Sequence, residues 1–368
     1  MSLESRVLRL MEEPHPGPAG RVALGGLALL EKAYIRGVTA RRAKDTAHAV
    51  HAGVPVLSVG NITAGGTGKT PCIMKLASLL AQAGRSPAIL TRGYRGRLEK
   101  TGGIVSDRSG IRVTQAMAGD EPYMMAVKLP GVPVIAGRDR TVSAAAARAL
   151  GADVLLLDDG FQYWKLVRDL DIVLIDSTHP FGGGRVLPRG LLREPMDALR
   201  RAGLFILTKA GQVSEEDRAA IRETIRTWQP EAPILEADHT PQTFTPLAEW
   251  PAVKSIAEAS GTAIFLLSGI GNPGGFRKTA EAVGFIVKGA LALPDHHDYT
   301  EADLARASKE AAACGADVIA VTEKDAVKIK NCLHGETAPH FPIGVLGIEM
   351  TFSGSGEAVF QKKAEEFL

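Results

Sequence analysis

The sequence predicts an α/β protein made of a parallel-sheet α/β/α domain followed by a smaller α/β/α domain. Between residues 54 and 210, short apolar runs alternate with stretches of helical periodicity. These runs are continuously apolar, which is typical of strands covered on both faces of a parallel sheet. A second, shorter series of the same kind begins near residue 262. We therefore place the domains at residues 1–210 and 211–368, with the last helix able to return to the first domain.

The individual elements follow from the same patterns. Strands of the first series are predicted at residues 54–60, 86–91, 132–137, 152–159, 170–176 and 202–208. Helices are predicted at residues 71–84, 141–150 and 212–229. The second series has a strand from residue 262 and a glycine-rich turn, then a helix at 276–284, a strand at 285–293, a helix at 300–314 and a strand at 316–325. The stretch between the two series contains several prolines and is predicted to be irregular.

The bulk composition is that of a globular protein with a sizeable core. Of 368 residues, 45% are hydrophobic and 23% are charged. The formal net charge of +2 gives no reason to expect a nucleic acid as partner. The three cysteines are scattered without metal-ligand spacing, which indicates a reducing compartment. No protein partner is evident from the sequence.

Residues 21–50 are predicted to form an amphipathic helix, because apolar residues recur three and four positions apart. These apolar residues are Leu24, Leu27, Leu30, Tyr34 and Val38, and basic residues follow them. Two interpretations stay open at this point. The helix either packs on the core, or lies on an anionic membrane surface with its apolar face in the lipid.

The stretch "NITAGGTGKTP" at 61–71 has the features of a phosphate-binding loop between a strand and a helix. The usual form, G-x-x-x-x-G-K-[ST], would place its first glycine where this chain has Thr63. The other glycines of the turn are present, so we still expect a nucleotide site with Lys69 on the β- and γ-phosphates and the Thr70 hydroxyl on Mg²⁺. The expected nucleotide contacts are Thr63, Ala64, Gly65, Gly66, Thr67, Gly68, Lys69 and Thr70.

Acidic residues follow two other apolar or turn segments. In "VLLLDDGFQ" (154–162), Asp158 and Asp159 stand at a strand end, where a carboxylate beside bound phosphates holds Mg²⁺. Because side chains alternate along a strand, we expect only one of the two to touch the ion directly. In "AGDEPYMMA" (118–126), Asp120 precedes Pro122, and the pattern fits either a functional carboxylate or a simple helix cap.

Basic loops at predicted strand ends suit anionic ligands. They are "TRGYRG" (91–96) with Arg92, "GRDR" (137–140) with Arg138 and Arg140, and "PFGGGRVLPRGLLREP" (180–195) with Arg193 and Glu194. "LPDHHDYT" (293–300) invites a metal interpretation, which we disfavour because adjacent histidines in a strand point opposite ways. "LTKA" (207–210) and "VTEKD" (321–325) only faintly match a guanine-reading motif, and we treat both as strand ends with solvated charge.

Taken together, these stretches resemble the tetraacyldisaccharide 4'-kinase family, the lipid A 4'-kinases of Gram-negative bacteria. The matching stretches are "SVGNITAGGTGKTP", "TRGYRG", "GDEPYMMA", "GRDR", "LDDGFQ", "PFGGGRVLPRGLLREP", "PDHHDY" and "TEKDAVK". They occur in the family's order between about residues 54 and 328. The family's phosphate-binding loop lacks the first glycine, so Thr63 is the family's form.

The resemblance implies transfer of the γ-phosphoryl group of ATP, with Mg²⁺, to the 4'-hydroxyl of a tetraacylated disaccharide 1-phosphate. It implies two α/β/α domains joined by a small β linker, with the active site in the cleft between them. It also implies peripheral attachment of the N-terminal helix to the cytoplasmic face of the inner membrane, which strengthens the membrane interpretation of residues 21–50.

The resemblance further implies roles for individual residues. Asp120 matches the proposed general base, with His296 rather than His297 as its partner. Asp158, Asp159 and Glu194 match the acidic residues around the metal, together with Thr70. Substrate or phosphate contacts are expected from Arg92, Arg138, Arg140, Gln162 and Arg193. Tyr163 stands where the family usually has histidine, which concerns fine substrate contacts.

Two other functional classes remain open from the residues themselves. A nucleotide-switch GTPase could share the deviant phosphate-binding loop, but it should contain a base-reading motif that is not evident here. A kinase for a soluble small molecule would not need an amphipathic N-terminal helix.

Overall fold

The computed structural model describes residues 17–333 and 341–367, and contacts within it divide the chain into two units. The first unit comprises Met1–Thr91, Asp139–Asp238 and Thr351–Leu368, and the second comprises Arg92–Arg138 and His239–Met350. The two units are therefore interleaved along the chain. This division differs from the predicted one, because the segment Arg92–Arg138 belongs with the second unit and the first unit continues past residue 210 to Asp238. The C-terminal residues lie in the first unit, a return that the sequence analysis allowed for the last helix.

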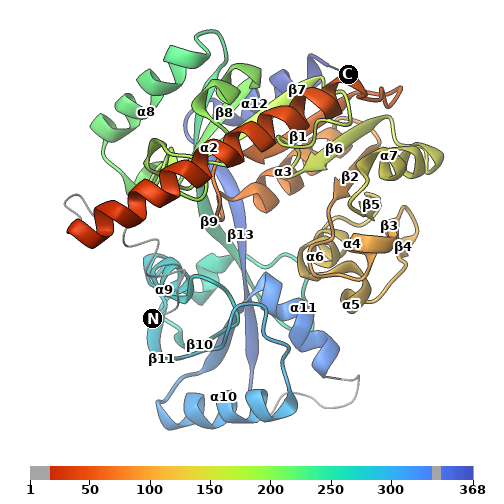
Figure 1. Ribbon diagram of the computed structural model, residues 1–368. Coiled ribbons are helices and arrows are strands. Elements are labelled where there is room, and N and C mark those ends of the chain that lie inside the picture. The colour runs from red at the N-terminus through yellow and green to blue at the C-terminus, as the bar shows by residue number, and fades with distance from the viewer. Residues whose placement is uncertain (1–16, 334–340, 368) are drawn as a thin grey trace. The chain divides into compact units, whose positions relative to one another are not determined.

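The first unit contains a parallel sheet with the strand order β9-β8-β7-β1-β6-β2 (Figure 1). Its strands are β1 (Val56–Asn61), β2 (Pro87–Thr91), β6 (Val154–Asp158), β7 (Leu170–Asp176), β8 (Leu204–Thr208) and the first part of β9 (Ile234–Pro246). Its helices are α2 (Pro18–Ala47), α3 (Lys69–Gln82), α7 (Arg140–Ala149), α8 (Glu215–Trp228) and α12 (Gly356–Glu365), with the short helices η1 (Gly182–Gly184), η2 (Met196–Arg201) and η3 (Ala210–Gln212). Every residue of β1, β2, β6, β7 and β8 is buried, as the continuous apolar runs predicted.

The second unit contains a second parallel set of strands, in the order β11-β10-β12-β13. They are β10 (Ala263–Ser268), β11 (Ile286–Ala292), β12 (Val318–Thr322) and β13 (Ile343–Phe352), whose last two residues belong to the first unit. The helices here are α9 (Pro273–Ala282), α10 (Glu301–Ala313), α11 (Glu323–Cys332) and η4 (Ile256–Ala259). The predicted α/β class is confirmed in both units.

The segment Arg92–Arg138 adds a small antiparallel part to the second unit. It contains α4 (Leu98–Thr101), β3 (Gly103–Asp107), β4 (Gly110–Ile111), α5 (Gln115–Ala118), α6 (Asp120–Lys128) and β5 (Val134–Ala136). Strand β3 pairs antiparallel with both β4 and β5. The run at 132–137, predicted as part of the parallel series, therefore pairs antiparallel with β3, and β3 and β4 were not predicted.

The prediction that residues 321–325 form a strand end with solvated charge is wrong. Strand β12 ends at Thr322, whose hydroxyl accepts from the Asp325 N–H and so begins α11. Asp325 is fully buried and accepts hydrogen bonds from the Thr322 hydroxyl and the Gly269 N–H. Its carboxyl group is hydrogen-bonded inside the protein to a helix cap and a loop, and burial raises its pKa above the ordinary value.

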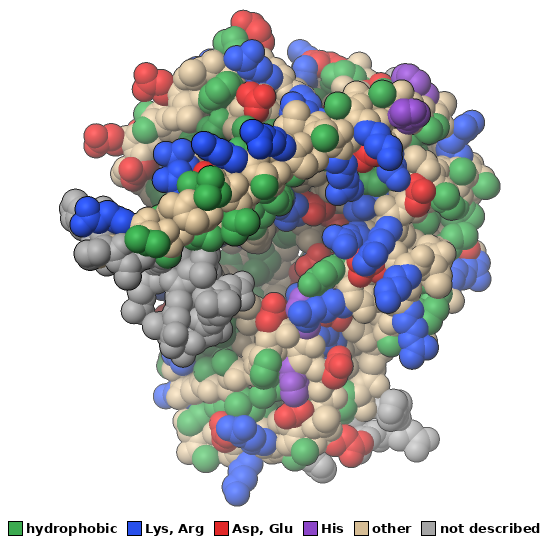
Figure 2. Space-filling view, in the orientation of Figure 1, with side chains coloured by type: hydrophobic (Ala, Val, Ile, Leu, Met, Phe, Trp, Pro, Cys, Tyr) green, Lys and Arg blue, Asp and Glu red, His purple; other side chains and the backbone are tan. Residues whose placement is uncertain are grey.

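Helix α2 is attached to the first unit along part of its length and exposes apolar side chains elsewhere. Buried Glu31 accepts from the Val186 N–H at 2.9 Å, and Tyr34 and Ile35 pack on the core beside β7 and β8. By contrast, Leu29 is 69% exposed and Leu30 is 57% exposed. Figure 2 shows hydrophobic and basic side chains together along this helix. Among the described residues, no helix is long and apolar enough to cross a membrane.

Candidate functional site

The loop predicted to bind phosphate lies between β1 and α3 of the first unit. Gly65 has φ +118° and Gly68 has φ +83°, which are conformations that side-chain-bearing residues rarely adopt. A Cβ atom added at Gly65 or Gly66 would meet no heavy atom within 4 Å, so the space over this part of the loop is open. The loop therefore presents backbone N–H groups at the N-terminus of a 14-residue helix, which is a suitable site for phosphate.

Lys69 is held at the mouth of this loop by polar contacts. Its Nζ lies 3.3 Å from Asn61 Oδ1, at the end of β1, and 3.5 Å from Asp159 Oδ1. Asn61 in turn donates to the Thr63 carbonyl at 2.9 Å. Thr63, which replaces the usual glycine, is buried and forms a β-bridge with Leu192. The deviant loop is thus supported by the segment that follows Pro180, rather than by a glycine at position 63.

The two aspartates after β6 have different surroundings. Asp158 is buried and accepts from the Thr91 hydroxyl at 2.9 Å. Asp159 has φ +51°, lies beyond the strand, and accepts from Arg193 Nη1 at 2.8 Å and 2.9 Å. Burial alone would raise the pKa of Asp159, but Lys69 and Arg193 lower it below its ordinary value. Asp159 is therefore the ionised carboxylate that contacts the loop lysine.

Glu194 is fully buried and is bonded to protein groups. Its Oε1 accepts from Arg201 Nη2 at 2.8 Å and from Gln162 Nε2 at 3.1 Å, and Arg42 lies 3.6 Å from its Oε2. Gln162 also donates to the Asn61 carbonyl at 2.9 Å. The structure thus connects two predicted residues, Gln162 and Glu194, to the end of β1.

The predicted arginines fall into different environments. In the second unit, Arg92 and Arg138 both donate to Glu99 Oε1, at 2.9 Å and 2.9–3.1 Å, while their own side chains stay half exposed. Glu99, which was not predicted, holds these two cations together. In the first unit, Arg140 is buried over the Tyr163 ring at 5.0 Å. The Tyr163 hydroxyl accepts from the Arg140 N–H at 2.8 Å, so this tyrosine supports the start of α7.

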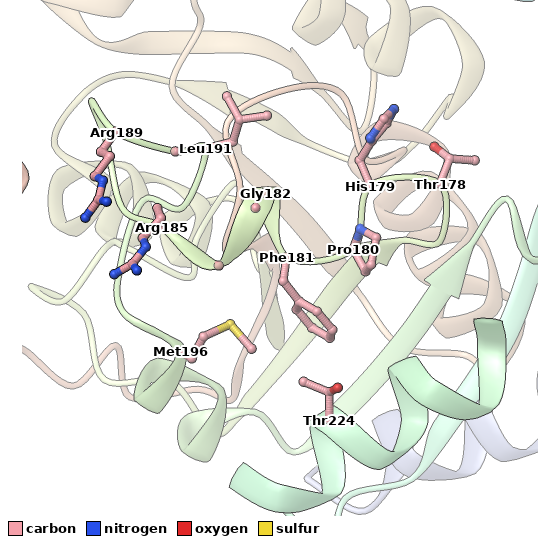
Figure 3. A pocket seen from close by; sticks show the side chains of 13 residues that line it. Thr178, His179, Pro180, Phe181, Gly182, Arg185, Arg189, Leu191, Met196 and Thr224 are labelled. Atoms are coloured by element: carbon pink, nitrogen blue, oxygen red, sulfur yellow. The ribbon is translucent and has the colours of Figure 1, made fainter. Parts of the chain in front are cut away.

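A pocket of about 720 Å³ lies beside the glycine-rich loop of the first unit (Figure 3). Phe181 points toward Thr224 of α8, and Met196 lines the same part of the pocket. Arg185 and Arg189 lie on one side of it. The pocket therefore combines apolar surface with two cationic side chains.

The second unit contains the predicted contact between Asp120 and His296. Their Oδ2 and Nδ1 atoms are 2.9 Å apart. The same Oδ2 lies 2.9 Å from Lys328 Nζ, and Gln115 Nε2 lies 2.5 Å from Oδ1. Burial alone would raise the pKa of Asp120, but the hydrogen bonds from Lys328 and His296 and the charge of Lys328 lower it below its ordinary value. The group is a buried, ionised carboxylate surrounded by donors.

Two details near this carboxylate differ from the simplest expectations. The helix cap is Gly119 with φ +90°, and Asp120 is the first residue of α6, so its side chain does not cap the helix. His297 does not join Asp120, because its Nε2 bonds to Asp303 Oδ2 at 3.0 Å at the start of α10. Asp120 therefore contacts His296 and not His297.

Lys328, Gln115, Glu99 and Asn61 are site neighbours that the sequence interpretation missed. Asn61 and Lys328 stand inside the stretches "SVGN" and "TEKDAVK", which matched the family, so those stretches already carried a signal for them. Nothing in the local pattern marks Gln115 or Glu99.

The residues of the first unit fit Mg²⁺ and a nucleotide by their chemistry. Thr70 begins the helix next to Lys69, and an ionised carboxylate, Asp159, contacts that lysine. Oxygen donors of this kind are the ligands that Mg²⁺ prefers. Among residues 17–333 and 341–367, no three acidic, histidine or cysteine side chains already converge as a metal site.

Comparisons with known proteins span both units. The family model described as tetraacyldisaccharide-1-P 4'-kinase matches residues 23–365. The chain is 42% identical over 328 residues to the tetraacyldisaccharide 4'-kinase of Anaeromyxobacter sp. (strain K), covering 88% of this chain and 86% of that protein. It is 36% identical over 367 residues to that of Halothermothrix orenii, covering 96% and 95%. The crystal structure of LpxK from Aquifex aeolicus in complex with ATP has a TM-score of 0.71 and 28% identity, covering 94% of this chain and all of that one.

Proposed function

The chain belongs to the tetraacyldisaccharide-1-P 4'-kinase family, and we propose that it transfers the γ-phosphoryl group of ATP to the 4'-hydroxyl of a tetraacyldisaccharide 1-phosphate in lipid A biosynthesis. The observation that carries the proposal is the open loop from Gly65 to Thr70 at the start of α3, with Lys69 beside Asp159. Phosphoryl transfer asks a protein mainly for such positioning and charge neutralisation.

We assign the phosphates of ATP to the backbone N–H groups of residues 63–70 and to Lys69. Mg²⁺ neutralises charge on the transferring phosphates when it is bound. Thr70, Asp158, Asp159 and Glu194 are the residues that would hold it. Of these, Asp159 has the most direct support, because it already contacts Lys69.

We assign the role of general base to Asp120. The acceptor O–H bond breaks as the new O–P bond forms, the bond from the γ-phosphorus to the bridging oxygen breaks, and ADP leaves. The proton passes to the Asp120 carboxylate, which His296 holds in place.

The remaining predicted residues are assigned to the anionic substrate. Arg92 and Arg138, held by Glu99 with their guanidinium groups half exposed, are suited to a phosphate of the lipid. Arg193 is suited to a phosphate oxygen near Asp159. Arg140 is buried and Gln162 bonds to Glu194, so we assign both to support of the site.

We propose peripheral attachment to the cytoplasmic face of the inner membrane through α2. Its exposed Leu29 and Leu30, with basic side chains on the same helix, are the chemistry of an interfacial helix. The pocket beside Phe181 offers apolar surface for part of an acyl chain, which is worth about 0.8 kcal/mol per buried CH₂ group.

Replacing Leu29 and Leu30 together by serine tests this attachment. Partial burial of two leucines in lipid is worth about 2 kcal/mol, so vesicle affinity should fall by about tenfold or more. Sedimentation with anionic vesicles measures the loss, and basal ATP hydrolysis should be retained. Val142→Ser, on α7 of the same unit and 65% exposed, is the matched control. Equal vesicle binding by both variants would refute the role of α2.

The proposed function is tested by a transfer assay with the purified chain. Radiolabelled ATP or GTP is supplied with a tetraacyldisaccharide 1-phosphate or with soluble sugar acceptors. We expect phosphate on the 4' position of the lipid, with ATP preferred. Transfer to soluble acceptors alone would indicate a small-molecule kinase, and GTP hydrolysis without any acceptor would indicate a nucleotide switch.

A further inference from the structure

The hydrogen bonds around Asp120 distinguish its two oxygen atoms. Oδ2 accepts from His296 Nδ1 and Lys328 Nζ, each at 2.9 Å, and so has both acceptor positions used. Oδ1 accepts from Gln115 Nε2 and has one acceptor position in use within the described residues. The two oxygens are therefore not equivalent toward a hydroxyl that arrives at this carboxylate.

The two ring nitrogens of His296 have different neighbours. Nε2 lies 3.4 Å from the Nζ atom of Lys324, an ammonium that can only donate. Asp295 Oδ2 lies 3.8 Å from the same nitrogen. On the other side of the ring, the ionised Asp120 carboxylate can only accept, so Nδ1–H donates to it. His296 thus acts on Oδ2 as a donor, in the same way as Lys328.

Lys328 is built into the interior of the second unit. Its side chain is 4% exposed, and its Nζ also donates to the His297 carbonyl at 3.1 Å. The helices that carry Asp120 and Lys328, α6 and α11, are joined again by the Lys128–Glu323 ion pair at 2.5 Å. A buried ammonium requires a charged partner, and breaking such a pair is costly. Lys328 is therefore fixed on Oδ2 rather than free to turn elsewhere.

We propose that Lys328 is a positioning residue for Asp120, which occupies Oδ2 and so leaves Oδ1 as the atom that receives the proton of the acceptor hydroxyl. The inference rests on the base role in the proposed function. It assigns to Lys328 the task of keeping a buried carboxylate ionised and correctly turned. It also makes Lys328 distinct from Lys324, which faces His296 and not Asp120.

The titration of the Asp120–His296 pair tests this assignment without any substrate. Lys328→Met removes a positive charge from beside both groups, so the proton that the pair binds should be taken up at higher pH. An opposite charge at this distance typically moves a carboxyl pKa by about 1–3 units, and we expect an upward shift of that size. Carbon-13 and nitrogen-15 NMR of the whole chain measure it. The other titratable groups beside His296 are Tyr94, Asp295 and Lys324, and they must stay unchanged. Glu121, which pairs with Lys324, and Asp325, whose pKa is influenced by Lys328, must also stay unchanged.

Three further measurements separate positioning from a plain structural role. Lys328→Arg keeps the charge and should restore the wild-type titration to within about half a unit. Lys330→Met, on the same helix but bonded to the Trp250 carbonyl, should leave it unshifted. Asp120→Asn should shift the nitrogen-15 resonance of Lys328 Nζ, because the ammonium loses the carboxylate that it contacts at 2.9 Å. This last measurement does not depend on whether Lys328→Met folds.

The activity profile gives the second readout. In Lys328→Met, the fall of kcat/KM on the acid side should begin one or more pH units higher than in the wild type. An unshifted pair titration in Lys328→Met, or an unshifted Lys328 in Asp120→Asn, overturns the inference. A shifted titration with no lipid phosphorylation by the wild type would instead reject the proposed function and leave the Lys328–Asp120 coupling established.

Discussion

Replacing Lys69 by alanine is expected to lower turnover about 10²–10³-fold and to weaken ATP binding, as removal of one preorganised donor to a developing charge does in other enzymes. The reason lies in its position at the start of α3, within 3.5 Å of Asp159 Oδ1. Asp159 still pairs with Arg193 when the ammonium is removed, so we expect the variant to fold. The phosphates of ATP, however, lose the positive charge of Lys69. Calorimetric ATP binding and single-turnover transfer measure the two effects.

Lys75 provides the matched control, because it lies on the same helix and pairs with Glu357 at 2.9 Å. This ion pair is partly exposed, and such pairs contribute about 0–1 kcal/mol. Lys75→Ala should therefore keep ATP affinity and turnover close to the wild-type values. If Lys69→Ala behaves like Lys75→Ala, the phosphate-binding role assigned to the loop cannot be correct.

Much of the first unit could be predicted because its signals are local. The buried strands β1, β6, β7 and β8 read as continuous apolar runs, and the turn before α3 contains the glycines that its positive φ angles require. Thr63 in place of the usual glycine did not hide this turn, because Gly65, Gly66 and Gly68 still marked it in the sequence.

Features that depend on distant contacts were not predictable from these patterns. The interleaving of the two units arises because the segment Arg92–Arg138 leaves the first unit after β2 and returns before α7. No local pattern marks such a crossing. Lys328 and Gln115 likewise meet Asp120 only in the folded unit, and as isolated residues they resemble ordinary surface positions.

The error at residues 323–325 has a clear physical origin. Charged residues after an apolar run usually mark a solvated strand end. Here Thr322 is the N-cap of a helix, and the Asp325 carboxyl group accepts hydrogen bonds from the Thr322 hydroxyl and the Gly269 N–H. Sequence shows the charge but not the donors that satisfy it.

Replacing Asp120 by asparagine should lower turnover by about 10²–10⁴-fold, the usual effect of losing a general base, while ATP binding persists. The amide has the size of the carboxylate. Its carbonyl oxygen can face Lys328 and His296, which places its NH₂ group where Oδ1 lies in the wild type. A donor then occupies the position that must accept the hydroxyl proton. Pre-steady-state transfer, with ATP binding measured in parallel, separates the chemical step from nucleotide affinity.

Asp303→Asn is a close control, because Asp303 is also bonded to a histidine, His297 at 3.0 Å, in the same unit. Asp303 belongs to the capping box of α10, so its loss should cost about 1 kcal/mol of stability and leave turnover unchanged.

The pKa of Asp120 is lowered in the folded chain, so its contacts contribute stability that is fully present above about pH 4 and is lost as the pH falls through the folded-state pKa. Asp120→Asn should remove this pH dependence as well as the catalysis. Turnover within a few-fold of wild type, with the acid-side stability change abolished, would show that Asp120 is a structural ion-pair partner of Lys328 and not the base.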